Sequence, residues 1–450
     1  MPHHTAVRAI RLQCSSDGTP GLPSDPSAQW RPRDCIAQSS AWRGTAVTTI
    51  ARNMSELGFA PVIAVLARGS NDVTTVSKHF SAQRSSQFGS ASLSERRISG
   101  ASRPRAESAR SYRNLGVVYG TVDRQGLAAL RADPRVRKVT AAPEFSLIRP
   151  VARASAVLPK TNTWGLEAME VPALWAEGLT GKDVRVAHLD TGVDATHPAL
   201  RTAVVKFAEF DRAGRVRPGV EPYDSDAEDS HGTHTAATIA GRPVRGSHIG
   251  VAPGASLYSA MVIEGGDIVA RILGGMDWAV GERARVLSMS LGIRGIDASF
   301  LDIVDILRSN GVLPVVAVGN EGPGTSRSPG NYPSALSVGA HDEQFAVADF
   351  SSSQRFVRRS QPLVPDVVGP GVDVVSAASQ GKYRSLSGTS MATPHVAGLA
   401  ALLVEARPDV TVDRLERAIF ASARPGQMDV ERVNRGAVNA RLALAALRDE

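Results

Sequence analysis

The feature that most limits the fold is an alternation of short apolar runs with helical patterns from residue 164 onward. The runs at 184–189, 286–291 and 313–318 are rich in Val, Leu and Ala, and helix candidates fill 268–280 and 300–309. Continuous apolar runs are typical of strands buried on both faces, and intervening helices are typical of parallel connections. The sequence therefore predicts an α/β fold, a doubly wound and mostly parallel sheet flanked by helices.

The front of the chain predicts a different organisation. Strand patterns at 61–66, 115–122 and 136–140 alternate with helix patterns at 71–80 and 125–132, which indicates a small α+β, ferredoxin-like unit over 58–145. A Ser/Arg-rich stretch at 81–113 is expected to be a loop.

The chain is thus divided into 1–57, a disordered extension; 58–145, the small unit; 146–163, a linker with mixed small residues and Pro; and 164–450, the large domain. The change in composition near Met54 suggests that translation begins there. An intact mass starting at Met1 in the unprocessed protein would contradict this hypothesis.

Composition limits the classes of protein. Apolar residues make up 42% and charged residues 21%, as in soluble globular chains. No apolar run approaches the ~18–20 residues of a membrane span. His3, His4, Arg8 and Arg11 interrupt any secretory signal core, so we expect the chain to be cytoplasmic or exported by an unrecognised route.

Charge is divided unevenly along the chain. Residues 1–158 carry +12 and residues 159–450 carry −5. This asymmetry suits either a nucleic-acid-binding arm or two segments that dock on each other, and we favour docking because the front part lacks an aromatic-rich basic motif. Cys14 and Cys35 both precede the predicted units, so neither is expected to staple a core or act as a nucleophile there.

Four polar stations fall at predicted strand ends or helix starts: Asp190-Thr191-Gly192, His231-Gly232-Thr233-His234, Gly319-Asn320-Glu321-Gly322 and Gly388-Thr389-Ser390. Together they supply the groups that acyl transfer needs. A serine hydroxyl needs a base, imidazole titrates in the right range, and a carboxylate can orient the imidazole. A neutral amide can donate to the oxyanion.

Each station alone has an ordinary interpretation. Ser390 could cap a buried helix, with Pro394 tolerated in its first turn; His231 with His234 could be a weak zinc site or core histidines. Asn320 between glycines is often only a turn residue, and His188, inside a strand, is expected to be a core histidine. The four stations in this order outweigh those interpretations.

These residues resemble the subtilisin-like serine peptidases. The similarity covers about residues 159–450 and includes Trp164-Gly165-Leu166 and Gly436-Ala437-Val438-Asn439-Ala440. The resemblance implies Asp190 as the group that orients the imidazole, His231 as general base, Ser390 as nucleophile and Asn320 as oxyanion donor. The order Asp, His, Ser is the known order of that family, in which loss of the amide donor costs about 10²- to 10³-fold in turnover.

The resemblance also implies a role for the front part and a way to bind substrate. Residues 58–145 look like an inhibitor-type pro-domain, so we expect self-cleavage within 146–163 and intramolecular inhibition. Polypeptide substrates are expected to pair with Ser290-Leu291-Gly292 and with Gly265-Gly266.

The P1 pocket, which receives the residue before the cut bond, would lie between 290–292 and 320–322. Arg327 stands near its usually small base. Either Arg327 swings to solvent, or it narrows the pocket and favours small or acidic P1 residues.

Two features of the sequence, one bearing on metal binding and one on charge, need separate interpretation. The resemblance implies a calcium site at positions that carry Lys160, Ala199 and Val244 here, none of which is an oxygen ligand of the kind calcium prefers. We therefore assign no metal or cofactor, while other calcium sites stay open. The stretch 201–230 carries the acidic residues Glu221, Asp224, Asp226, Glu228 and Asp229. A solvated loop is the favoured interpretation, and a metal or a basic substrate is the alternative.

Three functions stay open from the sequence. The first is a serine endopeptidase made as a self-processing zymogen, and the second is a peptide ligase or macrocyclase on the same scaffold. The third is a catalytically silent binding module, which the presence of all four polar stations disfavours. No nucleic-acid or membrane partner is expected.

Overall fold

The computed structural model describes residues 49–67, 69–70, 72–80, 109–211, 214–263, 265–358 and 361–449. Cys14, Cys35 and most of the Ser/Arg-rich stretch lie outside these residues. In the described part of the chain, no helix combines the length and the apolar character needed to cross a bilayer.

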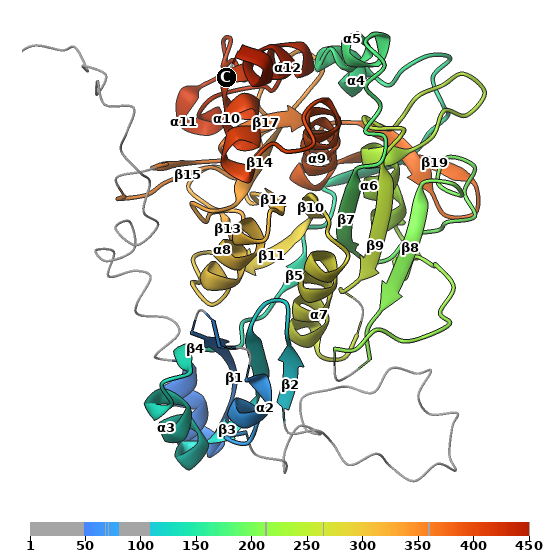
Figure 1. Ribbon diagram of the computed structural model, residues 1–450. Helices are drawn as coiled ribbons and strands as arrows, with labels where there is room; N and C mark the ends of the chain where they lie inside the picture. The colour runs from blue at the N-terminus through green and yellow to red at the C-terminus, as the bar shows by residue number, and fades with distance from the viewer. Residues whose placement is uncertain are drawn as a thin grey trace, which may run out of the picture. The chain divides into compact units, whose positions relative to one another are not determined.

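A parallel sheet of seven strands forms the centre of the large domain (Figure 1). In spatial order its strands are β17 (Val367–Pro370), β14 (Leu336–His341), β12 (Leu313–Ala317), β10 (Val286–Met289), β7 (Arg185–Asp190), β9 (Ser256–Met261) and β8 (Val204–Glu209). Every neighbouring pair is parallel. The predicted fold class is therefore confirmed.

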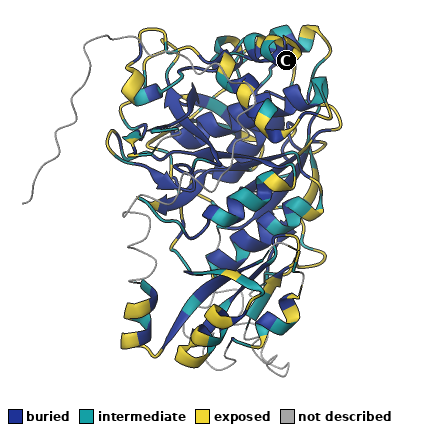
Figure 2. Cartoon of the chain, turned by 60° about the vertical axis from the view of Figure 1, so that its left-hand side comes forward, coloured by how far each residue is buried: buried dark blue, intermediate teal, exposed yellow. Residues whose placement is uncertain are grey.

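Helices cover both faces of this sheet. Successive side chains of each strand point to opposite faces, and because both sets are apolar, each face is buried under helices. Val186 and Val286 belong to the same core as α6 (His231–Ala240) and α9 (Thr389–Ala406). Ala187 and Leu287 belong to a second core with α7 (Ile268–Gly281) and α8 (Leu301–Ser309). Figure 2 shows the sheet buried between these layers.

The remaining elements of the large domain lie around this sandwich. The helices are α4 (Trp164–Ala168), α5 (Val171–Ala176), α10 (Val412–Ser422), α11 (Val430–Val433) and α12 (Ala440–Asp449). The short strands are β5 (Ser146–Leu147), β6 (Ala152–Ser155), β11 (Leu291–Arg294), β13 (Arg327–Ser328), β15 (Gln354–Arg355), β16 (Leu363–Val364), β18 (Val374–Ala378) and β19 (Lys382–Ser387).

The buried helix α9 begins at Thr389, so Ser390 stands in its first turn as expected. The expectation for Pro394 was wrong, because Pro394 is the sixth residue of the helix and lies in the second turn. A proline there cannot donate to the carbonyl of Ser390 four residues earlier. That carbonyl instead accepts a hydrogen bond from Ser290 Oγ at 3.2 Å.

The front part folds as a separate four-stranded antiparallel sheet in the order β2-β3-β1-β4. Its elements are β1 (Phe59–Leu66), α2 (Val73–Ser77), β2 (Ala109–Tyr112), β3 (Val117–Asp123), α3 (Arg124–Ala132) and β4 (Val136–Ala141). This is the βαββαβ arrangement of ferredoxin-like units. We refer to residues 49–145 below as the N-terminal unit.

Two details of this unit differ from the sequence predictions. β2 lies inside the stretch expected to be a loop, because its pairing with β3 stabilises a run that lacks strand character of its own. Residues 49–56 are helical, and Ile50 and Met54 are buried in the core of the N-terminal unit, although 1–57 was expected to be disordered.

The N-terminal unit packs against α7 and α8 through apolar and charged contacts. Ile63, Tyr112 and Val117 share one core with residues of both helices. Lys138 Nζ lies 2.7 Å from Asp302 Oδ2 on α8. Arg110 pairs with Asp267, the residue that caps α7. The basic front of the chain is therefore docked on acidic side chains of the large domain, as the charge division indicated.

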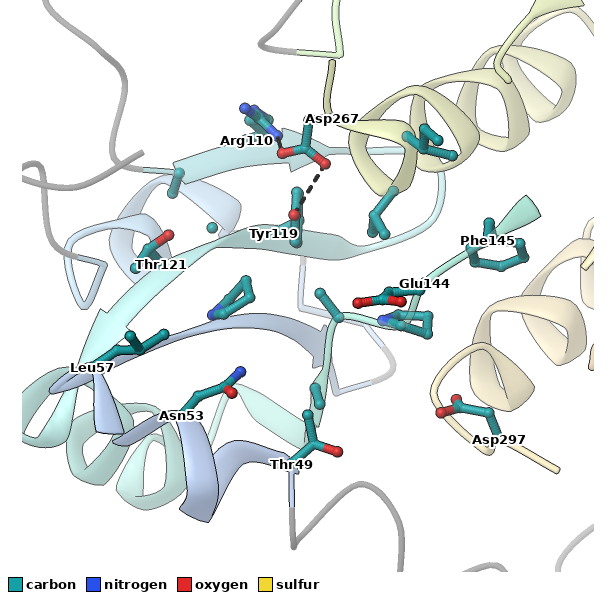
Figure 3. A pocket seen from close by; sticks show the side chains of 18 of the residues that line it. Thr49, Asn53, Leu57, Arg110, Tyr119, Thr121, Glu144, Phe145, Asp267 and Asp297 are labelled. Atoms are coloured by element: carbon teal, nitrogen blue, oxygen red, sulfur yellow. Dashed lines mark hydrogen bonds and ion pairs between the residues drawn. The ribbon is translucent and has the colours of Figure 1, made fainter. Parts of the chain in front are cut away.

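A cavity of about 690 Å³ lies at this junction. Figure 3 shows Tyr119 and Arg110 reaching Asp267 at its edge, and the Tyr119 hydroxyl donates to Asp267 Oδ1 at 3.0 Å. None of the four predicted catalytic residues lines the cavity, so we assign it to the docking of the N-terminal unit rather than to the chemistry.

Candidate active site

The four polar stations converge at one edge of the parallel sheet. Asp190 is the last residue of β7. The next strands to join this sheet lie on both sides of β7, with β9 on one side and β10 on the other, so β7 lies at the topological switch point of the sheet. His231 opens α6, Asn320 follows β12, and Ser390 lies in the first turn of α9.

The carboxylate of Asp190 and the imidazole of His231 form a short hydrogen bond. His231 Nδ1 lies 2.6 Å from Asp190 Oδ1, and both side chains are buried. The backbone N–H of Thr191 donates to the same oxygen at 2.8 Å. The first turn of α6 packs closely against the loop that follows β7. This approach requires Gly232, because a Cβ there would lie 2.1 Å from the carbonyl oxygen of Gly192.

Electrostatics in this pair favour a charged imidazole. Burial would lower the pKa of His231, but the charge and hydrogen bond of Asp190 outweigh it and hold that pKa above 6.5. Burial would likewise raise the pKa of Asp190, but the His231 imidazole keeps it below its ordinary value. The pair is therefore suited to gaining a proton on His231 while Asp190 stays ionised.

Two other histidines near this pair are core residues. Burial lowers the pKa of His188 to about 4, and its ring nitrogens lie 3.0 Å from Ser259 Oγ and 2.9 Å from Thr235 Oγ1. His234 Nε2 donates to the carbonyl of Val374 at 2.9 Å, and burial lowers its pKa to about 3. Among the described residues, no group of three or more His, Cys, Asp or Glu side chains could hold a metal ion.

Ser390 and His231 lie in the same site, but no hydrogen bond joins them in this structure. The Ser390 hydroxyl donates to the carbonyl of Ile148 at 2.6 Å. Within the described residues, His231 Nε2 is buried without a hydrogen-bond partner. Hydrogen bonds between a nucleophile and its base often tighten only when substrate is in place, so the missing bond does not exclude Ser390 and His231 as such a pair.

The orientation of the Asn320 amide is fixed by its neighbours. Asn320 Oδ1 accepts from the Thr389 backbone N–H at 2.9 Å and from the Thr389 hydroxyl at 2.8 Å. Because a backbone N–H can only donate, the amide nitrogen must face the other way. That nitrogen donates to the carbonyl of Arg149 at 2.9 Å.

The carbonyls of Ile148 and Arg149 belong to a segment, residues 146–155, that crosses the site with a short strand at each end, β5 and β6. On one side β5 pairs antiparallel with β11, and Ile148 N–H donates to the Ser290 carbonyl at 3.1 Å. On the other side β6 pairs antiparallel with β19. The sequence predicted a linker with a processing site here but no strands, because the pairing depends on edges supplied by distant parts of the chain.

The expected substrate-binding edges are only partly engaged by this segment. Leu291 and Gly292 pair with Leu147 and Ser146. Gly265 and Gly266 form no ladder with the segment among the described residues, because β5 is the edge strand of its sheet and β11 is its neighbour there.

The hypothesis that Arg327 swings to solvent was wrong. Arg327 is 4% exposed, and its Nε donates to Glu321 Oε1 at 2.9 Å. A Cβ added at Gly292 would lie 3.2 Å from Arg327 Cβ, and one at Gly319 would lie 3.2 Å from Arg327 Cγ. The side chain therefore fills the space between the two expected walls of the P1 pocket, with its charge matched by Glu321.

The acidic stretch is only partly the solvated loop that was expected: Glu221 and Glu228 are exposed, but the other three acidic side chains are largely covered. Asp226 and Asp229 have side chains only 7% and 4% exposed. Asp224 accepts from the backbone N–H of Thr233 at 2.7 Å and from the Thr191 hydroxyl at 2.8 Å, and burial raises its pKa to about 6. Asp224 thus ties the loop after Asp190 to the first turn of α6, a role that charge patterning alone could not reveal.

The positions that hold calcium in related proteins do not fit this ion. Lys160 is exposed and cationic, Ala199 is fully buried in the apolar core, and Val244 packs against that core. Calcium requires several oxygen ligands, which these side chains lack.

We expect the imidazole of His231 to titrate above 6.5 when measured by NMR in a Ser390→Ala variant. Since the Asp190 carboxylate is what raises this pKa, Asp190→Asn should lower the midpoint by about one to three pH units. A midpoint that is the same in both variants would contradict the electrostatic account.

Comparison with known proteins agrees with this geometry. Residues 181–441 match the model of the subtilase family. The chain is 35% identical over 317 residues to subtilisin E of Bacillus subtilis (strain 168), covering 68% of this chain and 76% of that protein. It is 37% identical over 263 residues to a subtilisin of Bacillus pumilus, covering 56% and 90%. The chain therefore belongs to the subtilase family of serine peptidases, which act on polypeptides.

Proposed function

We propose that the chain is a serine endopeptidase that works through an acyl-enzyme formed on Ser390, and that it is made as a self-processing zymogen. The observation that carries the proposal is the buried Asp190–His231 hydrogen bond beside Ser390, in a site that already holds a peptide strand. His231 is the proposed general base, Asp190 the group that orients it, and Asn320 the oxyanion donor.

The proposed reaction is balanced by proton transfers through His231. Ser390 Oγ attacks the peptide carbonyl carbon while its proton passes to His231 Nε2, and Asn320 Nδ2 donates to the carbonyl oxygen as it becomes negative. The C–N bond then breaks, and the proton on His231 passes to the leaving amine. Water, deprotonated by the same imidazole, releases the carboxylic acid and restores Ser390.

A fluorophosphonate probe tests the nucleophile and its base directly. We expect Ser390 to be labelled in the parent protein after the chain has been processed, and labelling to be lost in Ser390→Ala. His231→Ala should slow labelling by at least about 10²-fold, since the hydroxyl then has no base. His188→Gln is a matched control, because that histidine is buried beside Asp190 but assigned no proton transfer. Equal labelling with and without His231 would contradict the proposed mechanism.

The zymogen part of the proposal is supported by how the N-terminal unit and the segment 146–155 contact the large domain. The segment covers Ser390, which is fully buried, and it pairs with strands on both sides of the site. The N-terminal unit that precedes it is anchored by the contacts of Lys138 and Arg110 with Asp302 and Asp267. An intact chain therefore excludes other polypeptides from its own site.

The two flanks of Arg149 are the proposed processing points. Ser390 contacts the carbonyl of Ile148, whereas Asn320 contacts the carbonyl of Arg149. Attack requires one carbonyl to meet both groups. A small shift of the strand in either direction would achieve this, and would lead to cleavage at Ile148–Arg149 or at Arg149–Pro150.

We expect purified parent protein to be cut within the segment and Ser390→Ala protein to remain intact under the same conditions. N-terminal sequencing of the large fragment should begin at Arg149 or Pro150. Cleavage of the Ser390→Ala variant at the parent rate, with no other protease present, would contradict self-processing. A parent fragment that begins elsewhere would contradict the proposed bond.

The filled base of the P1 pocket supports a preference for small or medium aliphatic P1 residues, and of the two processing bonds it therefore favours Ile148–Arg149, which has Ile148 at P1, over Arg149–Pro150. Because Glu321 already pairs with the guanidinium of Arg327, we no longer expect acidic P1 residues to be favoured.

A P1 peptide library should show poor hydrolysis of large aromatic residues. Arg327→Gly, combined with Glu321→Gln so that no unpaired carboxylate remains, should raise aromatic hydrolysis relative to alanine by at least about tenfold. Arg294→Gly, which removes a largely exposed arginine nearby, is the control. A parent enzyme that prefers large aromatic P1 residues would contradict the filled pocket.

A further inference from the structure

The segment 146–155 directs two of its arginines toward the acidic side chains of the stretch 201–230. Arg149 lies between β5 and β6, Arg153 lies in β6, and the guanidinium groups of both reach Asp229. Arg153 Nη1 lies 2.9 Å from Asp229 Oδ1 and 2.6 Å from Glu228 Oε1. Arg149 Nη1 lies 3.8 Å from Asp226 Oδ1 and 4.0 Å from Asp229 Oδ2.

Asp229 is the central member of this contact. Its side chain is only 4% exposed, and in the described part of the chain its ion-pair partners are Arg149 and Arg153 alone. Once the segment leaves, Asp229 loses both cationic partners that it has in the intact chain, and its carboxylate is available to a new one. The best replacement is a basic side chain on the next peptide to enter the cleft.

The backbone pairing makes this contact specific for one position. β6 pairs with β19 in a register that places Arg153 opposite Leu386, and Val151 N–H donates to the Ser387 carbonyl at 2.8 Å. A substrate held by the same edge would present the corresponding side chain to Asp229 and Glu228. This position lies on the leaving side of either proposed scissile bond.

We propose that Asp229, assisted by Glu228, forms a subsite that selects an arginine or lysine on the leaving side of polypeptide substrates. The arginines of residues 146–155 occupy that subsite in the intact chain. The inference rests on the proposed endopeptidase function, and it adds a specificity that the four polar stations do not carry.

Peptides that copy residues 144–157, with a fluorophore and quencher at their ends, test the subsite on processed full-length protein. One peptide keeps Arg153, and two carry Arg153→Ala or Arg153→Glu. In the parent enzyme we expect kcat/KM to be about tenfold higher for the arginine peptide than for the alanine peptide, and lowest for the glutamate peptide. The difference should shrink as salt is added.

Enzyme variants then locate the effect. Asp229→Asn should reduce the arginine-to-alanine ratio to about twofold or less, and Glu228→Gln, at an exposed position, should reduce it partly. Glu221→Gln is the matched control, because this exposed residue belongs to the same acidic stretch and should leave the ratio unchanged.

The outcomes separate the two proposals. Equal hydrolysis of the arginine, alanine and glutamate peptides by the parent enzyme would overturn the subsite and leave the endopeptidase function standing. The same ratio in the parent enzyme, Asp229→Asn and Glu228→Gln would overturn the assignment to these carboxylates. Absence of hydrolysis of every peptide would overturn the endopeptidase function, and the subsite with it.

Discussion

The hydrogen bond between Asp190 and His231 is the interaction on which the rest of the site depends. A buried carboxylate is tolerated only when it is paired and hydrogen-bonded, and the Thr191 N–H and the imidazole satisfy this requirement. The pairing needs the end of β7 to meet the start of α6, which the switch point of the sheet and Gly232 allow. The loop after β12 and the first turn of α9 then bring Asn320 and Ser390 to the same edge.

A second principle is that the chain serves as the first ligand of its own cleft. Basic side chains of the N-terminal unit contact acidic side chains of the large domain, and basic side chains of residues 146–155 do the same. Backbone pairing holds the segment with little demand on sequence, and the ion pairs add demands at particular positions. In the proposed zymogen, inhibition and substrate preference therefore use the same contacts.

Much of the architecture was predictable because the spacing of apolar residues along the chain indicates which segments form strands and which form helices. The strands at β7, β10 and β12 and the helices α7, α8 and α10 fall where their apolar patterns indicated. The four polar stations were recognised because acyl transfer requires those residue types. β2 was missed, since a strand with little apolar pattern of its own forms only beside a partner. Pro394 was placed one turn too early, because the helix start depends on the loop before it.

By itself the sequence determined the fold class, the presence of the serine, imidazole and carboxylate that the proposed chemistry needs, and the division of charge between front and back. Each of these follows from residue type and short-range spacing. Only the tertiary structure decided that Arg327 turns inward to Glu321, that Asp229 is buried against two arginines, and that residues 146–155 cross the site. These are contacts between segments far apart in the chain, and their free energies depend on burial and geometry that no local pattern encodes.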